Sequence, residues 1–137
     1  MNKELIKIMK FAIVGVSNVA IDIGLFNILL FVGLNPYLAS VISYTLAATN
    51  SFIHNRRWTF SDGKGHPIHQ YLFFMLANGI GYIFNIVLVN LALTYILPNN
   101  IALSANIAKL GAVLLITTWN YGISRYVIFK PKEKSVN

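Results

Sequence analysis

The sequence predicts an all-α integral membrane protein in which four transmembrane helices form two helical hairpins. Hydrophobic residues make up 56% of the 137-residue chain and charged residues only 11%, against roughly 25% charged residues in soluble domains. The apolar residues fall into four runs, each long enough for the roughly 20 residues that a bilayer core requires. The lysines and arginines lie mainly at the ends of these runs. We therefore treat residues 1–137 as a single transmembrane domain.

The first predicted hairpin contains spans 11–33 and 37–55. A short basic lead, residues 1–10, precedes a first apolar run that is longer than the 7–15 residues of a signal peptide. An uncharged turn, residues 33–36, joins the two spans. Along the second span, Ala39, Ser43 and Ala47 recur every four residues. Small residues at this spacing let a neighbouring helix approach closely, so we interpret them as a packing stripe.

The second predicted hairpin contains spans 71–97 and 101–124. A polar loop, residues 61–70, leads into it, and an uncharged turn, residues 98–100, joins its spans. The loop contains His66 and His69, but the chain has no cysteine and these histidines form no recognisable metal-ligand cluster. We therefore expect no metal and no cofactor.

The distribution of basic residues predicts the orientation in the membrane. Four spans place both termini and the loop between the second and third spans on one side. The two turns on the other side contain no lysine or arginine, so the positive-inside rule makes the basic side cytoplasmic. That side carries Lys3, Lys7, Lys10, Arg56, Arg57, Lys64, Arg125, Lys130, Lys132 and Lys134. The net charge of +7 could suggest a nucleic-acid partner, but the basic residues lie in short clusters beside the apolar segments. This placement instead predicts a multi-pass protein of the cytoplasmic membrane in contact with membrane lipids, and no nucleic-acid partner.

Residues 50–60, at the end of the second span, are the strongest candidate for a binding site. Asn50 and His54 are one helical turn apart and Arg57 follows seven residues after Asn50, a spacing that predicts one shared helix face. With Arg56 and Asn55 they form a predicted site for a lipid phosphate and sugar, and Arg125 occupies a similar place at the end of the last span. We call the ends of the second and fourth spans, where the chain leaves the membrane, the first and second exits. The aromatic residues beside them are predicted interfacial anchors: Trp58, Phe60, Tyr126 and Phe129. The simpler alternative is that the arginines only fix the topology.

The two hairpins resemble each other in sequence. At an offset of 69 residues, the aromatic and basic residues of the first exit match those of the second, from Phe52 and Tyr121 to Phe60 and Phe129. At an offset of 63 residues, Asp22 matches Asn85. Both halves enter from the cytoplasmic side, so the sequence indicates a parallel repeat, a construction that transporters use.

Polar residues lie deep inside the predicted spans. A charged group at a helix centre costs about 2.5–3.5 kcal/mol on insertion scales, and Asp22 and Lys109 are predicted to lie at similar depths. They form either a structural ion pair or part of a polar cavity that meets a ligand. The remaining intramembrane polar residues are Asn18, Asn78, Tyr82, Asn85 and Asn106. No histidine has serine and carboxylate partners and no acidic pair or phosphate-binding glycine loop is present, so we expect no catalytic residues and no enzyme activity.

These residues resemble the GtrA-like family of small four-span membrane proteins. The resemblance runs from about Lys10 to Phe129 and is strongest in the run Asn55-Arg56-Arg57-Trp58-Thr59-Phe60. The opening Phe11-Ala12-Ile13-Val14-Gly15, with Asp22, and the later Ala108-Lys109-Leu110 are also similar to the family. The second exit departs from it, because Ser124-Arg125-Tyr126 lacks the second basic residue that the family often has.

The resemblance implies a role in polysaccharide biosynthesis or teichoic-acid glycosylation at the cell surface. Members of the family are thought to move polyprenyl-phosphate-linked sugars across the cytoplasmic membrane, and related domains are fused to glycosyltransferases. The resemblance therefore implies a flippase for such a lipid, with a membrane glycosyltransferase as partner and a homo-oligomer as a further option. The alternatives are a non-transporting anchor for the glycosyltransferase and a small drug/proton antiporter. Lys109 argues against the antiporter, because it would neutralise the buried acid.

Overall fold

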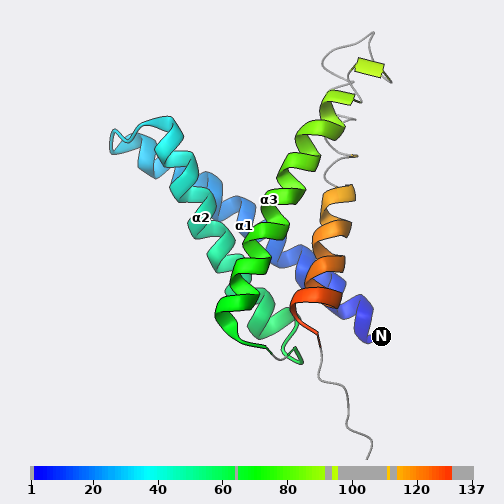
Figure 1. Cartoon of the computed structure of the whole chain (residues 1–137). Coiled ribbons are helices and arrows are strands. Elements are labelled where there is room, and N and C mark those ends of the chain that lie inside the picture. The colour runs from blue at the N-terminus through cyan, green and yellow to red at the C-terminus, as the bar shows by residue number, and fades with distance from the viewer. Residues whose placement is uncertain (1, 64, 92–93, 96–110, 112–113, 131–137) are drawn as a thin grey trace, which may run out of the picture. The chain divides into compact units, whose positions relative to one another are not determined.

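The structure is a computed structural model that describes residues 2–63, 65–91, 94–95, 111 and 114–130 (Figure 1). Every regular element in these described ranges is helical. The chain divides into two compact units, one formed by Met1–Gly65 with Phe129–Asn137 and the other by His66–Ile128. Each unit contains one of the predicted hairpins.

The first unit is built from α1 (Lys3–Phe31), α2 (Pro36–His54) and the short π-helix η1 (Asn55–Thr59). The predicted basic lead, residues 1–10, therefore lies mostly within α1. Asn2 caps the first turn of α1, because the Asn2 side chain accepts a hydrogen bond from Glu4 N at 3.2 Å. Among the described residues, α1 is the one helix that is long and apolar enough to cross a membrane.

The turn between α1 and α2 follows from its residues. Gly33 has a φ of +86°, a conformation that glycine adopts without steric cost, and Leu34 N donates to Leu29 O at 3.0 Å. Asn35 then caps α2 by accepting a hydrogen bond from Tyr37 N at 2.9 Å, and Pro36 occupies the first turn of the helix. Proline suits this position because its missing N–H would have no intrahelical partner there.

The predicted packing stripe is confirmed. Ala39, Ser43 and Ala47 are at most 1% exposed, α2 packs along α1 (Figure 1), and Ser43 donates a hydrogen bond to Asp22 of α1. The same spacing continues through Ser51 and Asn55, which are also buried. Side chains elsewhere on the hairpin, such as Val16 at 73% and Phe31 at 92% exposed, form the apolar outer surface expected of a membrane protein.

The second unit contains α3 (Pro67–Leu91), a helical segment at residues 114–123 and the π-helix η3 (Ser124–Ile128). Half of the fourth predicted span, residues 101–124, lies outside the described residues. The described part of this helix packs on α3 where Gly81 is buried. A Cβ at Gly81 would lie 3.2 Å from Asn120 Oδ1 and 3.3 Å from Ile116 Cγ2. The glycine therefore allows the two helices of this hairpin to approach closely.

The two π-helices support the sequence repeat. η1 begins at Asn55 and η3 begins at Ser124, which is the same offset of 69 residues that relates the two exits in the sequence. In both hairpins the second helix therefore widens into a π turn at the corresponding residue. π turns often occur at functional sites.

Candidate functional site

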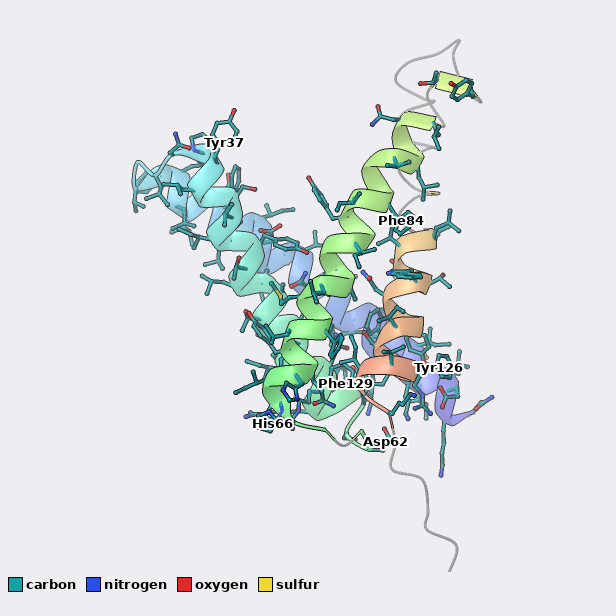
Figure 2. The ribbon with its side chains drawn as sticks, in the orientation of Figure 1. Tyr37, Asp62, His66, Phe84, Tyr126 and Phe129 are labelled. Carbon is teal, nitrogen blue, oxygen red and sulfur yellow. The ribbon has the colours of Figure 1, made fainter. Side chains whose placement is uncertain are left out.

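The end of α2 carries both arginines of the predicted phosphate site on the turn η1. The N–H of Phe60 donates to Asn55 O at 2.8 Å, a five-residue separation that closes the π turn around Arg56 and Arg57. Figure 2 shows Tyr37 at one end of the α1–α2 hairpin and Asp62 and Phe129 at the other. The arginines thus lie at the end of the hairpin opposite the α1–α2 turn.

Two lysines at the start of α1 hold this exit in place. Lys10 Nζ donates to the backbone oxygen of Trp58 at 3.3 Å and lies 5.2 Å from the centroid of the Trp58 ring. The last carbonyl groups of a helix have no intrahelical donor, so Lys10 satisfies one that the turn leaves free. Lys7 Nζ forms an ion pair of 2.7 Å with Asp62. Both lysines were predicted only as topology signals.

A buried aromatic cluster lies beneath the exit. Phe60 and Phe129 are fully buried, and their rings stack with a centroid distance of 5.2 Å and an interplanar angle of 13°. Phe11 and Phe52 complete the cluster, 6.1 Å from Phe60 and 5.9 Å from Phe129 respectively. The prediction that Phe60 and Phe129 are interfacial anchors is therefore wrong, because an aromatic beside a basic residue has the same sequence pattern whether it faces lipid or protein.

The other two aromatic residues remain compatible with an interfacial role. Trp58 is 42% exposed and Tyr126 is 64% exposed. The ammonium group of Lys10 lies over the Trp58 ring, and the guanidinium carbon of Arg125 lies 5.8 Å from the ring centroid of Tyr126. Each exit therefore pairs a cation with an exposed aromatic ring, an arrangement worth about 0.5–1 kcal/mol at exposed sites.

The two arginines of the first exit differ in their surroundings. Arg57 is exposed and, among the described residues, forms no hydrogen bond, ion pair or ring contact. Arg56 is half-buried and already interacts with a protein group. Five guanidinium N–H donors of Arg57 are therefore free to bind a ligand. Arg57 is the residue of the predicted phosphate site that is best placed to do so.

The shared helix face predicted for Asn50, His54 and Arg57 is not maintained. His54 Nδ1 lies 2.9 Å from the backbone oxygen of Asn50, so this pair keeps α-helical spacing. The wider turn begins at Asn55, immediately after His54, and the spacing of 3.6 residues per turn does not extend to Arg57. His54 and Arg57 are both exposed, whereas Asn50 is half-buried.

Asn55 does not lie on the ligand-accessible surface. It is 1% exposed, and its Nδ2 donates to Ser51 Oγ at 3.3 Å. Its Oδ1 and the Oγ1 of Thr59 are buried without a hydrogen-bond partner among the described residues. The sequence alone placed Asn55 in the phosphate site because of its proximity to the arginines. Its place on the packing stripe, eight residues after Ala47, was the better signal.

The second exit resembles the first in its backbone and differs in its side chains. Gln70 Nε2, from the first turn of α3, donates to Ile128 O at 3.0 Å, so a side chain from the start of the hairpin again satisfies an exit carbonyl. Arg125 is half-buried. The position that corresponds to Arg57 is occupied by Tyr126, so this exit has no second guanidinium group.

Asp22 contacts the packing stripe. Ser43 Oγ donates to Asp22 Oδ1 at 2.5 Å and lies 3.2 Å from Ser40 O. A pocket of about 200 Å³ opens beside the carboxylate and is lined by Asp22, Ile23, Phe26 and Ser40. Lys109, the predicted partner of Asp22, lies outside the described residues. Asp22 lies nine residues before the end of α1 and Ser43 seven residues after the start of α2. The antiparallel hairpin therefore brings them together, a contact that the spacing within one helix does not reveal.

The remaining intramembrane polar residues are divided between the two units. In the second unit, Asn78 Nδ2 donates to Phe74 O at 2.8 Å and Asn78 Oδ1 accepts from Asn120 Nδ2 at 3.4 Å. Tyr82 is 63% exposed, so it does not join this pair. In the first unit, Asn18 Oδ1 is buried without a partner among the described residues. The side chain of Asn85 and all of Asn106 lie outside the described residues.

Comparisons with known proteins place the chain in a family of membrane proteins. Residues 10–129 match the model of the GtrA/DPMS transmembrane domain. The chain is 31% identical to the uncharacterized membrane protein YngA of Bacillus subtilis (strain 168), over 98% of this chain and 87% of that protein. The matches confirm the predicted fold class, an all-α integral membrane protein of four helices, and they cover both hairpins. The chain therefore belongs to the GtrA/DPMS transmembrane domain family.

Proposed function

We propose that this protein translocates a polyprenyl-phosphate-linked sugar across the cytoplasmic membrane for cell-surface polysaccharide or teichoic-acid glycosylation. Membership of the GtrA/DPMS family supports a role in handling lipid-linked sugars. The observation that carries the proposal further is the exposed Arg57 on a turn held by Lys10 and by the buried Phe60. Such an arrangement suits an anionic headgroup at the membrane surface.

The chemistry of the exit matches a lipid phosphate. A guanidinium group donates two parallel hydrogen bonds to phosphate oxygens, and charge-assisted bonds of this kind are roughly twice as strong as neutral ones. Arg57 supplies the free group, and Arg56 adds positive charge beside it. Holding the turn in advance reduces the entropy lost when the ligand binds. The apolar outer surface of the hairpin is compatible with a long polyprenyl chain in the surrounding lipid.

Translocation requires no covalent step, so the proposed function is not an enzymatic one. The protein would deliver its lipid to a membrane glycosyltransferase on the other face of the membrane, alone or as a homo-oligomer. A non-transporting subunit that anchors the glycosyltransferase would use the same phosphate site. Such a subunit would bind the lipid but leave it in its original leaflet.

The experiment reconstitutes the purified protein into vesicles that contain a polyprenyl-phosphate sugar with a radiolabelled sugar. An impermeant glycosidase outside the vesicles reports which labelled sugars are accessible. Translocation makes the sugars of the inner leaflet accessible with time, whereas an anchor leaves them protected. Persistent protection, in vesicles whose protein is folded and binds the lipid, would contradict translocation and favour the anchor.

Two variants separate a phosphate site from a topology signal. Lysine keeps the positive charge of arginine but is a point charge without the planar fork. The variant Arg56→Lys with Arg57→Lys should insert normally and translocate at least tenfold more slowly. Arg125→Lys is the matched control, because Arg125 lies at the other exit, and it should have a smaller effect. Wild-type rates in the double variant would show that the arginines act only as anchors.

A further inference from the structure

We propose that the pocket beside Asp22 is a second binding site, the sugar station, which binds the sugar of the translocated lipid. It is separate from the first exit, where Arg56 and Arg57 lie. The inference rests on the proposed function and assigns it a further site. The pocket is formed entirely within the α1–α2 hairpin and is lined by Asp22, Ile23, Phe26 and Ser40.

The pocket lies in the half of the hairpin remote from the arginines. Asp22 is 12 residues beyond Lys10 on α1, about 18 Å at 1.5 Å per residue. Ser40 is only four residues beyond the first residue of α2, about 6 Å from the α1–α2 turn. From Ser40 to Arg57 there are 17 residues, or about 25 Å along the helix. One sugar-phosphate headgroup is too short to occupy both places, so the two sites act one after the other.

The lining of the pocket has the chemistry of a sugar site. Ser43 Oγ donates a hydrogen bond to Asp22 Oδ1, and the other carboxylate oxygen accepts no hydrogen bond from any described residue. That oxygen accepts a bond from a sugar hydroxyl, and the Ser40 hydroxyl can donate or accept a second. Phe26 and Ile23 offer apolar surface to the C–H groups of the ring. The volume of about 200 Å³ is below the roughly 300–1,000 Å³ of sites for drug-sized ligands, which suits one monosaccharide unit.

The charge of Asp22 discriminates between the two parts of the headgroup. A carboxylate repels a phosphate and accepts hydrogen bonds from hydroxyl groups, whereas the arginine exit attracts the phosphate. The headgroup would thus be recognised by its phosphate at the cytoplasmic end and by its sugar near the opposite end. Repulsion of the phosphate at the second station would favour release.

Within the described part of the chain, the carboxylate of Asp22 has one neutral hydrogen-bond donor, Ser43. A charged group in a membrane helix is costly and normally faces a polar partner or a cavity. A bound calcium ion would need six to eight oxygen ligands, more than Asp22 and Ser40 provide. A hydroxyl-rich ligand accounts for both the free carboxylate oxygen and the apolar side of the pocket.

The test uses two probes that separate the stations. The protein in lipid nanodiscs is titrated with tritiated hexyl glycosides of glucose, galactose and N-acetylglucosamine, which carry a sugar but no phosphate, and separately with citronellyl phosphate, which carries no sugar. Asp22→Asn keeps the shape and the Ser43 contact but replaces charge-assisted bonds with weaker neutral ones. We expect it, and Phe26→Ala, to weaken glycoside binding at least fivefold. Neither variant should weaken citronellyl phosphate binding, whereas Arg57→Lys should weaken citronellyl phosphate binding alone.

Ile28→Ala is the matched control, because Ile28 is a 59% exposed residue of α1 that does not line the pocket. Failure of all three glycosides to bind, or binding that Asp22→Asn and Phe26→Ala leave unchanged, would overturn the sugar station. If citronellyl phosphate still depended on Arg57 in that case, the proposed function would survive. Loss of citronellyl phosphate dependence on Arg57, with glycoside binding at Asp22 intact, would instead refute the phosphate site.

Discussion

The clearest prediction of the structure concerns Phe129, whose replacement by alanine should strongly destabilise the first unit. The Phe129 side chain is fully buried and stacks on Phe60 at a centroid distance of 5.2 Å. It also lies 5.9 Å from the ring of Phe52. Phe129→Ala would therefore open a cavity inside the aromatic cluster of Phe11, Phe52, Phe60 and Phe129.

The expected size of the effect follows from the burial. Replacement of a buried phenylalanine by alanine typically costs about 3–5 kcal/mol, and the lost aromatic pair accounts for about 0.5–1.5 kcal/mol of this. Against a total unfolding free energy of about 5–15 kcal/mol, such a loss is a large fraction. The measurement is unfolding of the protein in mixed micelles by increasing denaturing detergent, followed by tryptophan fluorescence.

Phe31→Ala is the control, because it removes the same atoms from a side chain that is 92% exposed. Substitutions at such surface positions usually change stability by no more than about 0.5 kcal/mol. A double-mutant cycle with Phe60→Ala should show a coupling of about 0.5 kcal/mol or more, as residues in contact do. Equal destabilisation by Phe129→Ala and Phe31→Ala, or zero coupling between Phe60 and Phe129, would refute the packed cluster.

Three further predictions follow from the packing and the topology. Gly63→Ala should lower stability, because its Cβ would lie 2.7 Å from a backbone carbonyl oxygen, and an unchanged unfolding midpoint would contradict this contact. Gly81→Ala should also be destabilising, since the new Cβ would lie 3.2 Å from Asn120 Oδ1; the additional change Asn120→Ser should restore part of the loss, and strictly additive effects would argue against the contact. In intact cells, Asn35→Cys should react with an impermeant thiol reagent and Ser61→Cys should not, so labelling at Ser61 would overturn the predicted orientation.

The fold class and the hairpins could be predicted from the sequence because they depend on gross properties of the chain. Four apolar runs, their turns and the asymmetry of basic residues follow from the bilayer's thickness and charge preference. The packing stripe from Ala39 to Ala47 was predictable for a similar reason, since only small residues permit close approach of two helices. These arguments need the composition of a segment but not the position of individual side chains.

The details of the exit could not be predicted, because they depend on tertiary contacts. Nothing in the sequence distinguishes Phe60, which is fully buried, from Trp58, which is 42% exposed. The π turn also changes the direction of every residue after His54, which invalidated the argument from α-helical spacing. The role of Lys10 as a partner of the Trp58 carbonyl depends on the pairing of α1 with η1, and a search for charge clusters alone does not reveal that pairing.

The repeat explains why the first hairpin is the better candidate for the binding site. Both hairpins end in a π turn at corresponding residues, and in both a side chain from the start of the hairpin binds an exit carbonyl. The π turn and its bound carbonyl are therefore common to the two halves and do not by themselves select a ligand. The chemistry differs, because Tyr126 occupies the place of Arg57 and Asn85 the place of Asp22.

The polar residues between paired helices have also diverged. In the second unit Asn78 contacts Asn120 and Gly81 packs beside it. At an offset of 63 residues, Asn78 and Gly81 correspond to Gly15 and Asn18, and at an offset of 69 residues Asn120 corresponds to Ser51. Glycine and asparagine have therefore exchanged places between α1 and α3. In the first unit, a Cβ at Gly15 would meet no neighbouring atom within 4 Å among the described residues, and Asn18 Oδ1 is buried without a hydrogen-bond partner there. The amide contact between paired helices is therefore particular to the second unit in the described part of the chain. We propose that two groups of the first hairpin meet the ligand: the exposed guanidinium of Arg57, and the carboxylate oxygen of Asp22 that accepts no hydrogen bond from any described residue.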